Sequence, residues 1–260
     1  MANEQSGGVM ETVKTVVSAL LIAGVIRTLF FQPFWIPSGS MKSTLLVGDF
    51  LFVNKMAYGY SQYSCPFGIC PISGRLFGTE PERGDIIVFR HPTLGVDYIK
   101  RLIGLPGDKI QMKDGVLHIN GTLAPQVAQK TFVESYGPQG PQRRTPACSN
   151  GVVALGNECE KESFVETLPN GVKHTVLNVR KTEGDNTPVY NVPAGHYFFM
   201  GDNRDNSVDS RFAQGASGGV GYVPFENLIG RADRVIFSSA GARMLYFWTW
   251  RGNRFFKGLD

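Results

Sequence analysis

The chain has 260 residues, of which 42% are hydrophobic and 18% charged, with a formal net charge of +4. This composition excludes an intrinsically disordered chain, and the length suits one large domain or two small ones. The charge is small and no lysine/arginine block is present, so we expect no nucleic acid as a partner.

An apolar segment near the N-terminus predicts a membrane anchor. Residues 15–26 carry no charge, and the stretch 13–32 reaches the ~20 residues of a span if Lys14 and Arg27 extend toward the two interfaces. A cleaved signal peptide and a buried core helix are the alternatives. The residues after Arg27 are too bulky for a cleavage site. We expect residues 1–12 to be cytoplasmic and residues 13–32 to form one transmembrane anchor.

The rest of the chain is expected to be mainly β. Residues 50–53 and 85–89 form short apolar runs, and residues 109–124 alternate apolar and polar side chains around Asp-Gly and Asn-Gly turns. Further strands are expected at 197–200 and 234–237, and no long amphipathic helix follows the anchor. These patterns predict an antiparallel β-sheet catalytic core with an inserted β-rich cap, preceded by one N-terminal transmembrane helix.

Composition also suggests where the parts of the chain begin and end. Residues 126–185 are polar and rich in Pro, Gly, Asn and Thr, which we interpret as a non-catalytic cap. The cap would be inserted into a catalytic core of residues 33–125 and 186–242. Residues 243–260 mix aromatic and basic side chains, so we expect an interfacial surface there, with packing on the core as the alternative.

The four cysteines indicate disulfides in an oxidising compartment. Cys65, Cys70, Cys148 and Cys159 allow three pairings, of which local closure of each neighbouring pair is favoured. Their spacings are poor for zinc and no paired histidines lie nearby, so we expect no metal and no cofactor.

A serine and a lysine are the candidate catalytic pair. Ser40 follows the apolar segment, and Lys100 ends a strand-like run after Tyr98 and Ile99. Burial in such a setting lowers the pKa of a lysine, and a neutral amine can accept the proton of a serine nucleophile. The histidines lie in no triad-like motif, and we interpret them as structural or surface residues: His91, His118, His174 and His196.

Four motifs occur in a fixed order along the chain. They are Pro37–Met41 (PSGSM), Arg83–Phe89 (RGDIIVF), Tyr98–Arg101 (YIKR) with Gly104–Asp108 (GLPGD), and Gly201–Arg211 (GDNRDNSVDSR). Together they resemble the boxes of bacterial type I signal peptidases, the membrane-bound serine endopeptidases of the S26 type. The resemblance covers nearly all of residues 34–232.

The resemblance implies roles for four residues. Ser40 would be the nucleophile that forms an acyl-enzyme, and Lys100 its general base. The Ser38 hydroxyl and the Ser40 backbone N–H would bind the oxyanion, and Ser207 would orient Lys100. The activity implied is removal of N-terminal signal peptides from exported preproteins after small-x-small sites.

The resemblance also implies supporting and substrate-binding residues. Arg101 would pair with Asp202, which leaves Lys100 as the amine that titrates, and Asp209 would pair with Arg211. Shallow pockets for small substrate side chains would be lined by Phe34, Ile36, Pro37, Met41, Leu45, Tyr98 and Ile99.

The implied partners are preprotein signal peptides and the lipid bilayer, with proximity to the secretion translocon. The implied location is the bacterial inner membrane, crossed once, with the catalytic domain on the periplasmic side. Two departures are visible: Ser43 stands where many members carry proline, and the loop after Arg211 is longer than usual.

Other functions remain open at this point. A specialised conjugation or pilus processing peptidase of the same fold differs only in substrate. A self-cleaving repressor would need a DNA-binding module, and no helix-turn-helix pattern is present. A non-catalytic, membrane-anchored interaction protein would have no reason to keep Ser38, Ser40, Lys100 and Ser207.

Overall fold

A computed structural model describes residues 5–65, 68, 70–215, 217–241 and 246–259. Residues 1–4 of the expected cytoplasmic segment lie outside the described residues. So do residues 242–245 and 260, which include part of the expected interfacial segment.

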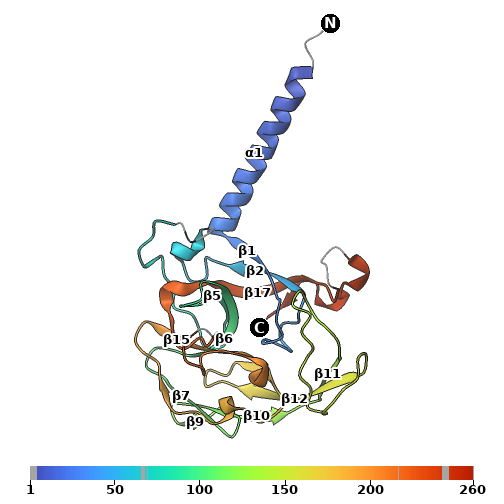
Figure 1. Ribbon diagram of the computed structural model, residues 1–260. Coiled ribbons are helices and arrows are strands. Elements are labelled where there is room, and N and C mark those ends of the chain that lie inside the picture. The colour runs from blue at the N-terminus through green and yellow to red at the C-terminus, as the bar shows by residue number, and fades with distance from the viewer. Residues whose placement is uncertain (1–4, 66–67, 69, 216, 242–245, 260) are drawn as a thin grey trace.

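The N-terminal helix stands away from a β-rich body (Figure 1). Helix α1 (Gln5–Leu29) contains a window, Gly8–Leu29, of 22 residues with a mean hydropathy of 1.8, none of it buried. By length and composition it is able to cross a membrane. The helix begins before the expected anchor of residues 13–32 and ends three residues earlier, because extended backbone begins at Phe31.

The body is built on one antiparallel sheet. Its strands are β1 (Phe31–Trp35), β2 (Asp49–Asn54), β5 (Ile86–Arg90), β6 (Asp97–Gly104), β15 (His196–Met200), β16 (Val223–Pro224), β17 (Leu228–Ser238) and β18 (Lys257–Gly258). They lie in the order β1-β2-β17-β5-β6-β15-β16, with β18 on β17. Pro33 is tolerated within β1 because this strand forms an edge of the sheet.

A second sheet contains the predicted hairpins. Strands β7 (Lys109–Lys113), β8 (Val116–Ile119) and β9 (Thr122–Leu123) follow one another, and β14 (Tyr190–Asn191) pairs with β7. The turn residues Asp114 and Asn120 have φ of 47° and 54°, and each is followed by a glycine with positive φ. These are the left-handed conformations that Asp-Gly and Asn-Gly pairs adopt in two-residue turns.

Residues 126–185 form a sheet of their own with the strands β10 (Gln126–Ala128), β11 (Phe132–Ser135), β12 (Glu158–Thr167) and β13 (Lys173–Asn178). The mainly β architecture is therefore confirmed. The disulfides are the local ones: Cys65 bonds Cys70, and Cys148 bonds Cys159, which fastens the preceding loop to β12. A short ribbon, β3 (Tyr60–Ser61) with β4 (Arg75–Leu76), completes the described strands.

Alternation of apolar residues along the strands produces the core. Leu51 and Val53 of β2 are fully buried and pack with Val235 of β17 and Val88 of β5. The other face of β2 carries Phe50 and Phe52, and the Phe52 side chain is 40% exposed. One face of this edge of the sheet therefore builds the core, and the other leaves aromatic surface near α1.

The C-terminal segment is fastened to the loop that follows β1. Arg254, which is 5% exposed, donates hydrogen bonds from Nε and Nη2 to the carboxylate of Asp49, which is fully buried. The same Nη2 donates to the Thr44 carbonyl at 2.9 Å, and the Leu46 N–H donates to Asp49 at 2.8 Å. The second half of the segment between β1 and β2 is thus held by one buried ion pair.

Replacing Arg254 by methionine should destabilise the fold by about 3–5 kcal/mol, because the Asp49 carboxylate would remain buried without its counter-charge. Chemical denaturation of the detergent-solubilised chain measures this change. The control is the exposed Arg234 on β17, the strand that pairs with β18. Arg234→Met should change the free energy of unfolding by less than ~0.5 kcal/mol. Equal denaturation midpoints for the two variants would contradict the assignment.

Candidate active site

The structure brings Ser40 and Lys100 into contact. Ser40 lies in the turn after β1, and Lys100 lies on β6 near the middle of the sheet. Lys100 Nζ is 2.7 Å from Ser40 Oγ, within a hydrogen bond, and both residues are buried. An amine and a hydroxyl at this distance can exchange a proton directly.

Burial sets the proton affinity of Lys100. Its pKa is lowered from the usual 10.5 to about 8, and loss of hydration on burial is the largest cause. The carboxylates of Asp209 and Asp202 raise the pKa in part, and Arg211 lowers it. A substantial fraction of the amine is therefore neutral at a mildly alkaline pH, when it can act as a base.

Asn203 binds the backbone around Ser40 at two points. Its N–H donates to the Ser40 carbonyl at 3.0 Å, and its Nδ2 donates to the Gly39 carbonyl at 2.8 Å. Gly201 allows this close approach, because a Cβ there would lie 2.6 Å from the Ser40 carbonyl oxygen and 2.3 Å from Ser207 Oγ. The segment that begins at Gly201 therefore packs directly on the turn that carries Ser40.

Ser38 and Ser207 are the other two serines expected in the site. Ser38 Oγ is 3.4 Å from Ser40 Oγ, and its residue is exposed. The Ser207 hydroxyl is buried without a hydrogen bond of good geometry in the described residues. The expected contact from Ser207 to Lys100 therefore stays a prediction.

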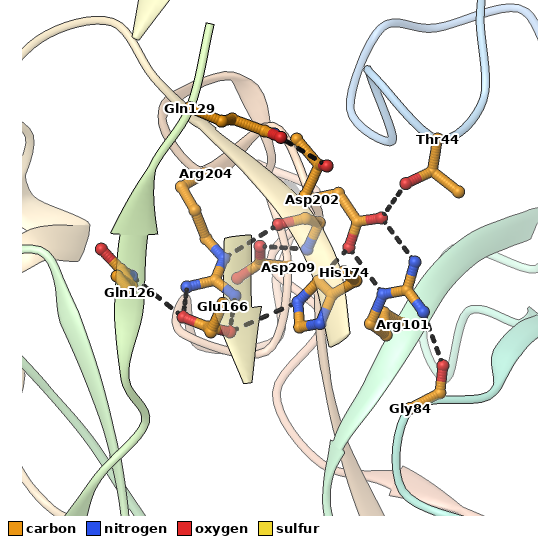
Figure 2. A network of polar contacts seen from close by, with 12 residues as sticks. Thr44, Gly84, Arg101, Gln126, Gln129, Glu166, His174, Asp202, Arg204 and Asp209 are labelled. Atoms are coloured by element: carbon orange, nitrogen blue, oxygen red, sulfur yellow. Dashed lines mark hydrogen bonds and ion pairs between the residues drawn. The ribbon is translucent and has the colours of Figure 1, made fainter. Parts of the chain in front are cut away.

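Arg101 and Asp202 form the bidentate pair beside Lys100 (Figure 2). Arg101 Nε and Nη2 each donate to the Asp202 carboxylate at 2.8 Å, and Nη1 donates to the Gly84 carbonyl at 2.7 Å. Thr44, four residues after Ser40, donates to Asp202 Oδ2 at 2.5 Å. Burial alone would raise the pKa of Asp202, but Arg101 holds it below the usual value.

A second ion pair continues this network into the sheet of residues 126–185 (Figure 2). Arg204 donates to both carboxylate oxygens of Glu166 on β12, at 2.9 Å and 2.5 Å. His174 Nε2, on β13, is 3.3 Å from Glu166 and 4.0 Å from Asp202. Burial opposes ionisation of Glu166, yet Arg204 and His174 keep its pKa far below the usual value.

Asp209 and Arg211 form a further buried pair. Arg211 donates from Nε at 2.9 Å and from Nη2 at 3.0 Å to the two oxygens of Asp209. Asp209 also accepts the Gly201 N–H at 3.0 Å. Arg211 keeps the pKa of Asp209 below its usual value although burial opposes this. The pair therefore braces the turn that carries Asn203.

The expected substrate-binding residues divide into two groups. Phe34, Tyr98 and Ile99 are half-buried and accessible to a ligand, and Pro37 is exposed. The other three are buried in the core and pack beneath Phe34 and Ile99: Ile36, Met41 and Leu45.

No histidine is bonded to Ser40 or Lys100 in the described part of the chain. His91 is buried, and its Nδ1 accepts the N–H groups of Thr93 and Leu94. His118 and His196 each contact a carbonyl two residues away, and His174 belongs to the network around Glu166.

Sequence comparisons place the chain among known proteins. The sequence model described as "Signal peptidase, peptidase S26" matches residues 9–237. Signal peptidase I of Rickettsia typhi and that of Rickettsia prowazekii are each 43% identical over 230 residues, covering 85% of this chain and 77% of the relative. The chain belongs to the S26 signal peptidase family. A solved signal peptidase I from Enterococcus faecalis is 29% identical and matches 59% of this chain and 97% of that chain, with a TM-score of 0.31.

Membership confirms the resemblance drawn from the ordered motifs, and it makes the chain an enzyme, a serine peptidase. Sequence reasoning did not single out Thr44, Glu166, His174 or Asn203 as site residues. Asn203 lies inside the Gly201–Arg211 motif, which is a signal that could have found it. The other three lie in segments with no motif, and only their spatial contacts identify them.

The activity of this S26 peptidase should rise with pH through the pKa of Lys100. Because this pKa is lowered to about 8, the neutral fraction grows about 50-fold from about pH 6 to about pH 8 and then levels off. A pH profile of kcat/KM on a peptide substrate tests this. An inflection near pH 6.5, or a flat profile over the same range, would contradict a lysine base.

Asn203→Ala should lower kcat about tenfold with little change in KM, because only the position of Ser40 is altered. The exposed Asn191, which lies outside the site on β14, provides the control, and Asn191→Ala should keep the wild-type kcat. Circular dichroism and thermal unfolding establish that both variants fold. A tenfold rise in KM at constant kcat would instead indicate a role in substrate binding.

Proposed function

We propose that this chain removes N-terminal signal peptides from exported preproteins, cutting after small-x-small sites by a serine nucleophile and a lysine general base. The observation that carries the proposal is the 2.7 Å contact between Ser40 Oγ and a buried Lys100 amine whose pKa is lowered to about 8. Membership of the S26 family supports it, since the Rickettsia relatives bear the name signal peptidase I.

The first half of the reaction forms an ester. Neutral Lys100 accepts the hydroxyl proton of Ser40 as Oγ attacks the carbonyl carbon before the scissile bond. The resulting oxyanion accepts hydrogen bonds from the Ser40 N–H and the Ser38 hydroxyl, which lies on the open side of the pair. The C–N bond then breaks, the leaving amine takes the proton from Lys100, and the signal peptide stays bound to Oγ as an acyl-enzyme.

The second half returns the enzyme to its starting state. Lys100, neutral again, accepts a proton from a water molecule that attacks the ester carbonyl. Collapse of this second oxyanion breaks the bond to Oγ, and Ser40 regains its proton from Lys100. The Arg101–Asp202 and Asp209–Arg211 pairs keep their charges throughout, so Lys100 alone changes protonation among them.

An extended peptide suits the surface beside the pair. Strand β1 is an edge of the main sheet, and an edge strand can pair its backbone with an added peptide strand. Phe34 on β1 precedes Ser40 in the chain, and Ile99 on β6 precedes Lys100. Both side chains are half-buried. With the core packed closely beneath them, only small substrate side chains would fit there.

The helix and the exposed aromatic residues support attachment to a bilayer. Helix α1 exposes its whole apolar window, and Phe52 lies near its end, exposed. In the C-terminal segment Phe247 and Trp248 are each 68% exposed, as at a membrane interface. We assign the protein to the bacterial inner membrane, with the catalytic domain on the periplasmic side near the translocon. The two disulfides suit that oxidising side.

Ser40→Ala and Lys100→Met should each lower kcat/KM on a preprotein with an Ala-x-Ala site by at least about a thousandfold, since both members of the pair act in every step. The exposed Lys113→Met is a matched control and should leave cleavage unchanged. Gel analysis of cleavage, with sequencing of the new N-terminus, measures both rate and site. Full activity of Lys100→Met would refute the base, and cleavage of nothing by the folded wild-type chain would refute the function.

A further inference from the structure

A small polar hollow opens beside the nucleophile. It has a volume of about 100 Å³ and is lined by Pro37, Ser38, Gly39, Ser40, Lys42, Val47, Gln139, Arg144, Thr145, Pro146 and Asn206. Of the residues expected to receive the small side chains, Pro37 belongs to this lining, whereas Phe34, Tyr98 and Ile99 do not. The hollow is therefore a separate space from the surface of Phe34, Tyr98 and Ile99, and it adjoins Ser40 itself.

Residues 126–185 supply one wall of the hollow, and hydrogen bonds and close packing hold this wall in place. Gln139 N–H donates to the Arg144 carbonyl at 3.1 Å, which closes a turn. Lys42 Nζ donates to Gln139 Oε1 at 2.7 Å, and Gln139 Nε2 donates to Glu134 at 2.7 Å. The turn also lies tightly against the nucleophile loop, because a Cβ on Gly140 would be 2.6 Å from Val47 Cγ1.

The charge of the hollow is positive. Its lining contains two cations, Lys42 and Arg144, and no carboxylate. Lys42 is buried and its charge is matched by Glu134 at 2.5 Å. Arg144 is exposed, and its side chain makes no ion pair or hydrogen bond with the described residues. Arg144 is thus a free guanidinium at the rim of the active site.

We propose that this hollow is the subsite for the first residues of the mature protein, and that Arg144 selects an acidic side chain there. The proposal rests on the proposed peptidase function and adds to it the preference on the leaving side of the scissile bond. A peptide that lays its small residues on Phe34 and Ile99 and its scissile carbonyl on Ser40 continues into the hollow. A carboxylate in the first residues after the cut would then pair with Arg144.

The test uses the full chain in detergent and peptides with a constant Ala-x-Ala site. Each peptide carries Glu, Gln or Lys at the first, second or third residue after the cut. At one of these positions the wild-type kcat/KM for Glu should exceed that for Lys by about fivefold, the size of a solvent-exposed ion pair. Arg144→Gln should bring this ratio close to one, and Arg144→Glu should invert it.

Two controls separate a direct contact from other effects. Arg143 is also exposed but does not line the hollow, so Arg143→Gln should keep the wild-type ratio despite the same loss of charge. The wild-type ratio should fall as salt rises from about 0.02 M to about 0.5 M, because ions screen an exposed pair. A merely structural role of Arg144 would change all peptides equally and would give no salt dependence.

The outcomes distinguish this subsite from the function on which it rests. In one outcome the wild-type chain cleaves the peptides, and Arg144→Gln shows the same ratio of kcat/KM for Glu to kcat/KM for Lys as Arg143→Gln at all three positions. The proposed subsite is then wrong, and the peptidase function stands. If the folded wild-type chain cleaves none of the peptides, both are wrong.

Discussion

The arrangement of the site depends on one constraint, the removal of the Lys100 amine from water against the Ser40 hydroxyl. An ammonium group in this position is costly, so the neutral base is favoured by burial itself. The amine stays neutral only if nearby negative charges do not raise its pKa again. Asp202 and Asp209 raise the pKa of Lys100, but each carboxylate is held in a bidentate pair with an arginine, which limits this effect. Of Lys100, Asp202 and Asp209, Lys100 is the group whose pKa lies near 8, whereas the pKa values of both carboxylates are lowered.

The same constraint explains why three distant segments must meet. The turn that carries Ser40, strand β6 and the Gly201–Arg211 motif are joined by backbone as well as by side chains. Asn203 holds the carbonyl groups of Gly39 and Ser40, and Asp202 binds Thr44 further along the same loop. Preorganised contacts of this kind let the hydroxyl stay within 2.7 Å of the amine without a reorganisation cost at each turnover. The pairs that screen the lysine thus also position the serine.

Sequence reasoning succeeded where the signal is local. The turns at Asp114 and Asn120, the apolar strands and the short disulfide loops are all encoded within a few residues. The ordered motifs identified the family because they carry the pair and its nearest partners. Strand β12 gave no comparable signal, since its inward positions include polar residues such as Glu166, which pattern reading assigns to the surface. Its partner Arg204 lies 38 residues away, and no local rule links the two.

The inserted sheet contacts the segment next to Ser40, although neither Ser40 nor Lys100 lies in it. Glu134 of β11 accepts hydrogen bonds from both Lys42 and Lys161, and all three side chains are largely buried. Burial lowers the pKa of Lys42, and Glu134 opposes this by favouring its charged form. Separation of the sheet from the core would leave these charges unpaired until water reached them, a large free-energy cost. Lys42 is two residues from Ser40, so this buried ion pair links the inserted sheet directly to the turn that carries Ser40. The sheet therefore belongs to the structure that surrounds Ser40, although neither Ser40 nor Lys100 lies in it.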